Sequence, residues 1–105
     1  MALKKIMAIV REERIDNVIT HFQEKGVPGA SFSKVRGYGE YVNPSDQRGL
    51  APCVKIEVIT SDDVADKVAR FLMQLANTGV EGDGIVTIAP VEKLYRIRDQ
   101  AEVDM

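Results

Sequence analysis

Residues 54–63 read Val54-Lys55-Ile56-Glu57-Val58-Ile59-Thr60-Ser61-Asp62-Asp63, and this stretch decides the fold. Apolar side chains at positions 54, 56 and 58 alternate with charged ones at 55 and 57, which predicts a strand with one buried face. The hydroxyl side chain of Thr60, with the carboxylate of Asp63 three residues later, is the pattern of a helix N-cap. The stretch therefore predicts a strand that passes directly into a helix.

The segments before this stretch predict the first half of a larger pattern. Residues 6–10 are apolar on both faces, as in a central strand. From Glu13 the spacing of apolar residues becomes helical, and Gly26 with Pro28 behind it ends the predicted helix. Residues 30–39 predict a second strand, which completes one β-α-β half.

The segments after the stretch predict the second half. Apolar residues continue at helical spacing from Val64 to Leu75, and Gly79 is the predicted end of this helix. Residues 85–89 predict a fourth strand and residues 93–98 a short fifth, before a polar tail at 99–105 that we expect to fray. The order β-α-β-β-α-β with an extra short C-terminal strand indicates an α+β fold. This is a ferredoxin-like plait, in which a four-stranded antiparallel sheet carries two helices on one face.

Composition excludes several classes of protein. The chain has 105 residues, 45% of them hydrophobic, and 14 Lys and Arg against 16 Asp and Glu give a formal charge of −2. We expect one globular domain over residues 1–105, and not a general binder of nucleic acid or anionic membranes. The single cysteine, Cys53, excludes an intrachain disulfide and zinc sites built on paired cysteines. No apolar run approaches the ~18 residues that span a bilayer, and no signal-peptide pattern is present, so we expect a cytoplasmic protein.

A long connection separates the second predicted strand from the strand at 54–59. It runs from Glu40 to Cys53, whereas hairpin loops usually have about two to five residues. Residues that do not extend a sheet recur in it, namely Asn43, Pro44, Ser45, Asp46, Gly49 and Pro52. Loops of this length inside small domains are commonly functional, so we favour a functional loop over a tolerated insertion.

Two later features suit an anion. The segment Thr78-Gly79-Val80-Glu81-Gly82-Asp83-Gly84 has three glycines, which allow successive backbone N–H groups to line a phosphate-sized concavity. The alternative is a helix cap followed by an ordinary tight turn. Arg96 and Arg98 flank Ile97 on the predicted fifth strand, where they would share one face about 6.6 Å apart and suit bidentate contact with a phosphate. The alternative is a pair of surface salt bridges, for example to Glu92 or Asp99.

The remaining candidates are weaker. Gly37-Tyr38-Gly39 suits either a strand-ending bulge or a close approach of the backbone to a ligand. His21 is expected on a helix surface, and Cys53 is expected to be a half-buried reduced thiol. No catalytic or metal-binding motif is present in the sequence.

With these features in place, the chain resembles the PII signal-transduction family over nearly its whole length. The resemblance is carried by Gly37-Tyr38-Gly39, Val54-Lys55-Ile56-Glu57, Thr78-Gly79 with Gly82-Asp83-Gly84, and Tyr95-Arg96-Ile97-Arg98. It implies a ferredoxin-like homotrimer, not an enzyme, that binds adenine nucleotides in clefts between subunits. It also implies a T-loop, here about 40–53, whose shape reports the nucleotide to a target, commonly a membrane transporter or a metabolic enzyme.

The resemblance assigns nucleotide-binding residues by position. Those expected around the adenine and ribose are Gly29, Ala30, Ser31 and Ile59. Those expected at the base of the T-loop, near the phosphates, are Gly37, Tyr38 and Gly39. Those expected to hold the phosphates are Gly82, Asp83 and Gly84 in the B-loop, about 78–84, with Arg96 and Arg98. The resemblance assigns no metal ligand and no permanently bound cofactor.

The chain departs from the family pattern at charged positions. Ile85 and Cys53 stand where the standard family has lysines, Glu40 where it has an arginine, and Tyr41 where it has the glutamine that places Mg²⁺ and 2-oxoglutarate. Each lost charge-assisted hydrogen bond is worth ~1.5–3 kcal/mol, so we expect ADP or AMP to be preferred over ATP, and little response to 2-oxoglutarate. The T-loop is also shortened, as in PII-like groups linked to inorganic-carbon uptake and carboxysomes, where bicarbonate acts beside the nucleotide. The chain is compatible with such a group.

Three alternatives stay open. One is a standard nitrogen-regulatory PII that responds to ATP and 2-oxoglutarate. A second is a small acylphosphatase-like enzyme that uses Arg48 and Asn43 of the long loop. A third is an RNA-binding plait, which would need exposed aromatic residues on its central strands and a basic face.

Overall fold

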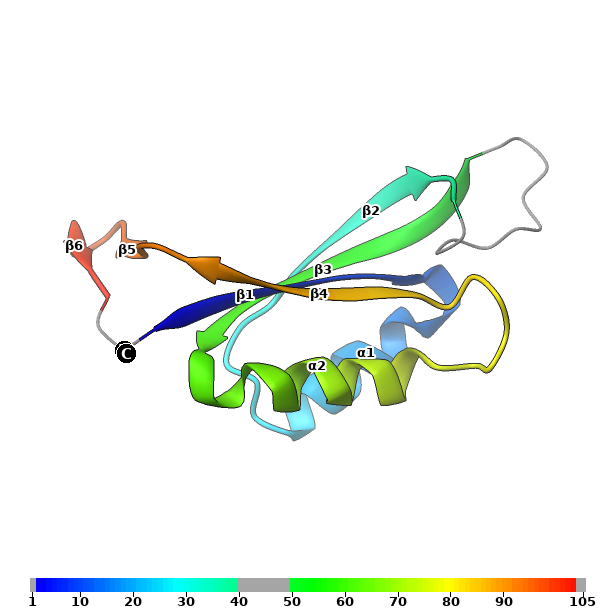
Figure 1. The fold of residues 1–105 in the computed structure, drawn as a ribbon, viewed down its shortest axis with the longest axis horizontal. Helices are drawn as coiled ribbons and strands as arrows, with labels where there is room; N and C mark the ends of the chain where they lie inside the picture. The colour runs from blue at the N-terminus through cyan, green and yellow to red at the C-terminus, as the bar shows by residue number, and fades with distance from the viewer. Residues whose placement is uncertain (1, 40–49, 104–105) are drawn as a thin grey trace.

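The computed structural model describes residues 2–39 and 50–103 of the chain. Its elements are β1 (Leu3–Arg11), a 3₁₀ turn (Glu12–Arg14), α1 (Ile15–Glu24), β2 (Ser31–Gly37), β3 (Ala51–Ser61), α2 (Asp62–Ala76), β4 (Gly84–Val91), β5 (Tyr95–Arg96) and β6 (Ala101–Glu102). Strands β1 to β4 form one sheet in the order β2-β3-β1-β4, and every neighbouring pair is antiparallel. Both helices cover the same face of this sheet (Figure 1), which confirms the predicted α+β, ferredoxin-like plait.

The core lies between the sheet and the helices. Ile6, Ala8 and Val10 of β1 stand opposite Val58, Ile56 and Val54 of β3, and all six side chains are at most 3% exposed. Val18 and Phe22 of α1 and Leu72 of α2 close over them. Burying each large apolar side chain stabilises the fold by roughly 1.5–3 kcal/mol, so the alternating pattern of the two central strands holds the sheet to its helices.

The other face of the sheet carries the charged members of the same strands. Lys5, Met7 and Ile9 of β1 alternate with the core residues, and they lie beside Lys55 and Glu57 of β3. No helix covers this face within the described residues (Figure 1). Neither central strand contains an aromatic residue, which weighs against an RNA-binding plait.

Strand β3 begins earlier than predicted. We expected a loop as far as Cys53, but Ala51, Pro52 and Cys53 already pair with Gly37, Arg36 and Val35 of β2. Pro52 is tolerated because β1 ends opposite Cys53, so β2 and β3 continue beyond it as a two-stranded ribbon with β3 open on one side. The rest of the predicted loop, residues 40–49, lies outside the described residues, as do Arg48 and Asn43 of the acylphosphatase alternative.

The predicted hydroxyl cap of α2 is wrong. Ser61 is the N-cap and makes no side-chain cap hydrogen bond, while the Thr60 hydroxyl donates to the Ser61 carbonyl at 2.9 Å. Pairing of the sheet persists to this point, because Ser61 still stands opposite Leu3 and the Asp62 N–H donates to the Ala2 carbonyl at 2.9 Å. The strand therefore satisfies the first helical N–H without a cap.

The helix ends differ in detail from the predictions. Gly26, with φ +74°, lies just past the end of α1 as expected, although the α-helix begins at Ile15 after the 3₁₀ turn and not at Glu13. Helix α2 ends at Ala76, so Gly79, with φ +77°, belongs to the following loop and does not end the helix. None of the helices in the described parts of the chain is long and apolar enough to cross a membrane.

The C-terminal segment is more ordered than predicted. The expected strand at 93–98 is reduced to Tyr95 and Arg96, because the chain turns back and β6 pairs with β5. The Gln100 N–H donates to the Ile97 carbonyl at 3.3 Å, and the Val103 N–H donates to the Leu94 carbonyl at 2.7 Å. The tail therefore pairs up to Val103 where we expected fraying, and Arg98 lies in the turn and not on the strand.

Candidate functional site

The loop that joins α2 to β4 is organised around the carboxylate of Asp83. Oδ2 of this side chain accepts the backbone N–H groups of Thr78 at 2.8 Å and Gly79 at 3.0 Å. Oδ1 accepts the Thr78 hydroxyl and, at 3.0 Å, Nε of Arg11. Two backbone amides of the segment predicted to bind phosphate thus donate to the Asp83 carboxylate instead. The sequence analysis did not predict this contact.

These hydrogen bonds favour the ionised form of Asp83. Donation from the Thr78 side chain and backbone, and from Arg11 and Gly79, holds the pKa of this carboxyl well below its ordinary value, although partial burial acts in the opposite direction. Asp83 is therefore a permanent anion inside the loop at neutral pH.

Arg11 connects the loop to the sheet. It is the last residue of β1, its side chain is only 9% exposed, and besides Asp83 its Nη2 donates to the Glu81 carbonyl at 2.6 Å. A third contact joins Nη1 to the Glu13 carboxylate at 3.6 Å. Sequence reasoning missed this residue, but the plait places the end of β1 beside the start of β4, which is the signal that could have found it.

The glycines of the B-loop have structural reasons to be glycine. Gly82 has φ +91° and Gly84 has φ +120°, conformations that other residues rarely adopt. A Cβ on Gly84 would stand 1.8 Å from the Ile9 carbonyl oxygen, so β4 crosses β1 there at a distance that only glycine permits. Of the three B-loop residues predicted to hold phosphate, Gly82 and Asp83 lie in this loop and Gly84 is the first residue of β4.

A second group of predicted residues meets in a hollow on the sheet. Its volume is about 460 Å³, and we call it the Ser31 hollow; it is lined by Lys5, Gly29, Ala30, Ser31, Glu57 and Ile59. All four residues expected around adenine and ribose line it. Lys5 and Glu57 were not among the predicted site residues, since only the register of β1 against β3 brings them to the same place.

One side of the Ser31 hollow is formed by an ion pair between Lys5 and Glu57. Glu57 Oε2 lies 2.5 Å from Lys5 Nζ, and Oε1 lies 3.7 Å from Lys55 Nζ. The hydrogen bond from Lys5 is the largest cause that lowers the pKa of Glu57. The hollow therefore presents an apolar side at Ile59 and the Glu57 carboxylate paired with Lys5, which suits a ring with polar edges.

The base of the long loop lies at the same end of the sheet as the B-loop. Gly37 is the last residue of β2 and pairs with Ala51, and Tyr38 beyond it is 77% exposed. Gly39 has φ +132°.

Arg96 and Arg98 lie at the opposite end of β4 (Figure 1). Strand β4 spans about 23 Å at 3.3 Å per residue, which separates β5 from the B-loop. The two side chains are 55% and 86% exposed, and both approach Asp99, at 3.0 Å and 3.6 Å, as the salt-bridge alternative anticipated. One chain by itself does not bring these arginines to the B-loop.

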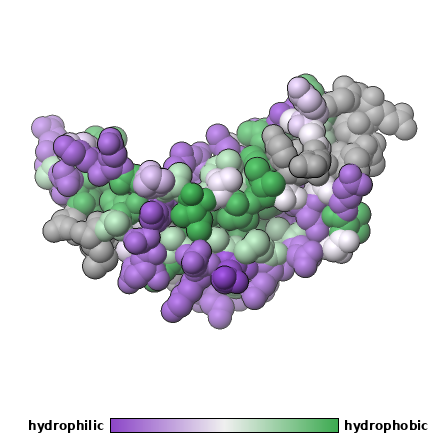
Figure 2. Space-filling model, in the orientation of Figure 1, coloured by the Kyte–Doolittle hydropathy of each residue, from purple (hydrophilic) through white to green (hydrophobic). Residues whose placement is uncertain are grey.

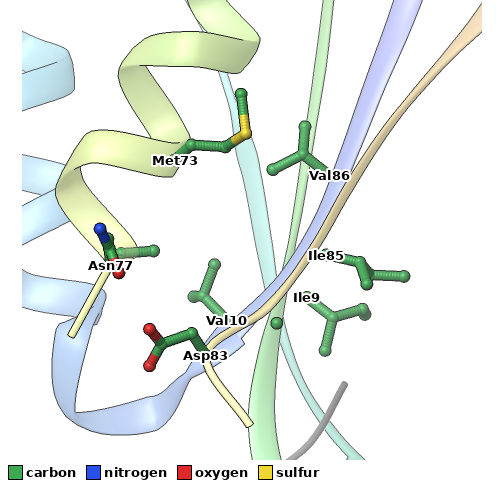
Figure 3. A pocket seen from close by; sticks show the side chains of 9 residues that line it. Ile9, Val10, Met73, Asn77, Asp83, Ile85 and Val86 are labelled. Atoms are coloured by element: carbon green, nitrogen blue, oxygen red, sulfur yellow. The ribbon is translucent and has the colours of Figure 1, made fainter. Parts of the chain in front are cut away.

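An apolar groove flanks the B-loop along the edge of the sheet. It holds about 310 Å³ and we call it the β4 groove; its walls are Ile9, Val10, Met73, Ala76, Asn77, Asp83, Gly84, Ile85 and Val86. In Figure 3, Met73 of α2 faces Val86 of β4 across it, and Asp83 closes the end at the loop. Figure 2 shows hydrophobic side chains gathered across the middle of this face, while hydrophilic ones cover the outer surface of the helices.

His21 and Cys53 take the structural roles expected of them. His21 Nδ1 lies 2.8 Å from the Asn17 carbonyl within α1. Cys53 is 5% exposed, more buried than predicted, and burial together with the Glu12 charge raises the pKa of its thiol. A buried, protonated thiol is a poor nucleophile and a poor metal ligand.

The fold is a ferredoxin-like plait with a glycine-rich loop before β4 and a hollow on its main sheet. Residues 3–101 match the family described as "Nitrogen regulatory protein P-II", and the chain belongs to this family. Nitrogen regulatory protein P-II of Cereibacter sphaeroides is 36% identical over 103 residues, which cover 91% of this chain and 92% of that protein. The protein of the same name from Azospirillum brasilense is 33% identical over 103 residues, covering 91% and 92%, and that from Klebsiella oxytoca is 32% identical over 109 residues, covering 97% of each.

Membership of the family settles the class of activity. PII proteins are signalling regulators that bind small effector nucleotides and target proteins, and they are not enzymes. The chain is therefore a regulatory signalling protein, as the sequence predicted, and the acylphosphatase alternative falls away.

Proposed function

We propose that the protein is a homotrimeric regulator that binds adenine nucleotides in clefts between its subunits. The observation that carries the proposal is the Ser31 hollow, where Gly29, Ala30, Ser31 and Ile59 line one cavity with the fixed Glu57 carboxylate. Its volume of about 460 Å³ suits a nucleoside.

The placement of the proposed phosphate-binding residues supports a cleft between subunits. Gly82, Asp83 and Gly84 lie at one end of β4, and Arg96 and Arg98 lie beyond the other end. One chain does not bring both groups to one phosphate, so in the proposed assembly the arginines of one subunit serve the B-loop of another. The apolar β4 groove and Ile97, which is 90% exposed, are surfaces that a second copy would cover.

The charge pattern favours ADP or AMP over ATP. Where the family has two lysines, this chain has Ile85, which lines the β4 groove, and Cys53, whose raised pKa keeps it uncharged. Fewer cations near the terminal phosphate mean less stabilisation of a triphosphate.

The output is a change in the T-loop, which then docks on or leaves a target such as a transporter or a metabolic enzyme in the cytoplasm. Its stems are fixed where Gly37 pairs with Ala51, and Arg36 donates to the Leu50 carbonyl at 3.4 Å. Gly37, Tyr38 and Gly39 connect this stem to the nucleotide cleft, with bicarbonate as a co-effector there.

Thermal unfolding with AMP, ADP and ATP, each with and without bicarbonate, tests the proposal. A nucleotide at ~100 Kd should add about 2.7 kcal/mol of stability. The solution mass should equal three chains. A monomer mass, or no stabilisation by any adenine nucleotide, would overturn the proposal.

A second candidate is a nitrogen-regulatory role of the standard kind, which the names of the relatives favour. It requires that 2-oxoglutarate strengthen the binding of Mg-ATP. The same titration decides between the two, because our proposal expects 2-oxoglutarate to leave the ATP affinity unchanged.

A further inference from the structure

Arg11 holds the B-loop through two contacts, and a third contact ties it to the 3₁₀ turn. Its Nε donates to Asp83 and its Nη2 to the Glu81 carbonyl, while Nη1 approaches Glu13. The Arg11 side chain is only 9% exposed and its hydrogen bond to Asp83 is partly buried, which limits competition from water at that contact. A planar guanidinium can meet partners in several fixed directions at once, which a lysine ammonium on a flexible stem cannot do.

The Asp83 side chain is fully engaged inside the loop. Both of its oxygens accept hydrogen bonds from Thr78, and Gly79 and Arg11 supply the rest. By contrast, the backbone N–H groups of Val80 and Glu81, which are exposed, donate no hydrogen bond to any residue in 2–39 or 50–103. The loop thus satisfies its inner amides itself and leaves outer amides for a ligand.

We propose that Arg11 is a positioning residue of the nucleotide site, and that the Asp83 carboxylate is its structural counter-ion and not a contact to the ligand. Together they hold the B-loop in its binding shape before a nucleotide arrives. Asp83 then contributes to phosphate binding only through the loop conformation it maintains. This inference rests on the proposed function, because it takes the B-loop as the phosphate-binding element.

The test compares Arg11→Gln and Asp83→Asn with the wild-type protein. The matched control is Arg70→Gln, since Arg70 is an exposed arginine on α2, away from the loop. Hydrogen exchange of the Thr78 and Gly79 amides is measured first, without nucleotide. Both loop variants should exchange at least tenfold faster at these amides, and the control should match the wild type.

Affinity for ADP and for adenosine is measured next. Because only the phosphates meet the B-loop, Arg11→Gln should weaken ADP binding about tenfold or more and leave adenosine binding unchanged. The double variant should bind ADP no more weakly than Arg11→Gln alone, since the two residues act as one unit. Arg11→Lys keeps the charge but not the planar guanidinium, so its ADP affinity should fall between those of the wild type and Arg11→Gln. It replaces Arg11→Gln in the test if that variant does not fold.

Three results would overturn the inference. They are unchanged exchange at Thr78 and Gly79, an equal loss of ADP and adenosine affinity, and ADP binding by Asp83→Asn that equals or exceeds the wild type. Failure of the proposed function gives a different result, because the wild-type protein would then bind no adenine nucleotide. The hydrogen-exchange measurement would still show whether Arg11 and Asp83 hold the B-loop.

Discussion

The carbonyl oxygen of Ile9 lies 1.8 Å from the point where a Cβ on Gly84 would stand. Gly84 is the first residue of β4 and pairs with Val10. The strand that follows the B-loop therefore begins in direct contact with the backbone of β1. The contact involves backbone atoms of both strands, and neither can move without breaking the pairing of β1 with β4.

Gly84→Ala should therefore destabilise the protein strongly. We expect a loss of roughly 3 kcal/mol or more in the free energy of unfolding, from the overlap with Ile9 and the φ of +120°. Gly79→Ala is the matched control, because Gly79 has φ +77° but nothing within 4 Å of its Cβ position, and it should cost only about 1 kcal/mol. Urea unfolding of both variants measures the difference, and equal losses would contradict this account.

The stability of the protein should depend on the ionisation of Asp83. Because the folded-state pKa lies below the ordinary value of 3.8, the stabilisation is fully present above that value and is lost as pH falls through the lowered pKa. Wild type should exceed Asp83→Asn by about 1.5–3 kcal/mol near neutral pH, the range for hydrogen bonds to charged groups. Urea unfolding of both proteins between pH 2 and 7 should show the gap narrowing below pH 3.8; a constant gap would argue against it.

Replacing both Arg96 and Arg98 by alanine should abolish stabilisation by ADP and spare the fold. Their ion pairs with Asp99 are exposed, so each should contribute only ~0–1 kcal/mol to folding. Thermal unfolding with and without ADP measures both effects. Arg70→Ala is the control for the loss of a surface arginine, and retention of the full ADP shift in the double variant would place the phosphates elsewhere.

Ile85→Lys should shift nucleotide preference toward ATP. Ile85 follows the B-loop and lines the β4 groove, and a lysine there would supply a charge-assisted bond worth ~1.5–3 kcal/mol, or about tenfold to a hundredfold in affinity. Ile85→Gln controls for loss of the apolar side chain without adding charge. Calorimetric titration with ATP and ADP gives the ratio, and the same ratio in both variants would count against a role for charge at this position.

Much of the fold was predictable because local patterns agree with the packing. The alternation at 54–58 and the helical stripes after Glu13 and Val64 each bury one face, and the structure places them as expected. The ends of elements were less predictable. Ala51–Cys53 joined β3 despite Pro52, and residues 97–98 left the fifth strand, because pairing with β2 and with β6 overrode local composition.

The candidate site was predictable as sets of residues but not as geometry. Gly29, Ala30, Ser31 and Ile59 do share one hollow, although 28 positions separate Ser31 from Ile59. Asp83 binds the Thr78 and Gly79 amides within its own loop, and the approach of Arg11, at a sequence separation of 72, depends on the β1–β4 pairing, which composition does not encode. The sequence therefore did not reveal that Asp83 occupies two amides of the glycine-rich segment.

The length of β4 has a genetic consequence if the proposed assembly holds. In that assembly the arginine pair of each chain contacts the B-loop of a neighbouring subunit. Loss of Arg96 and Arg98 in one chain therefore inactivates the nucleotide site at the intact B-loop of another. Co-expression of an Arg96→Ala, Arg98→Ala chain with a chain defective only in its glycine-rich loop should then restore some pockets in mixed rings. Two inactive alleles would complement each other within one particle.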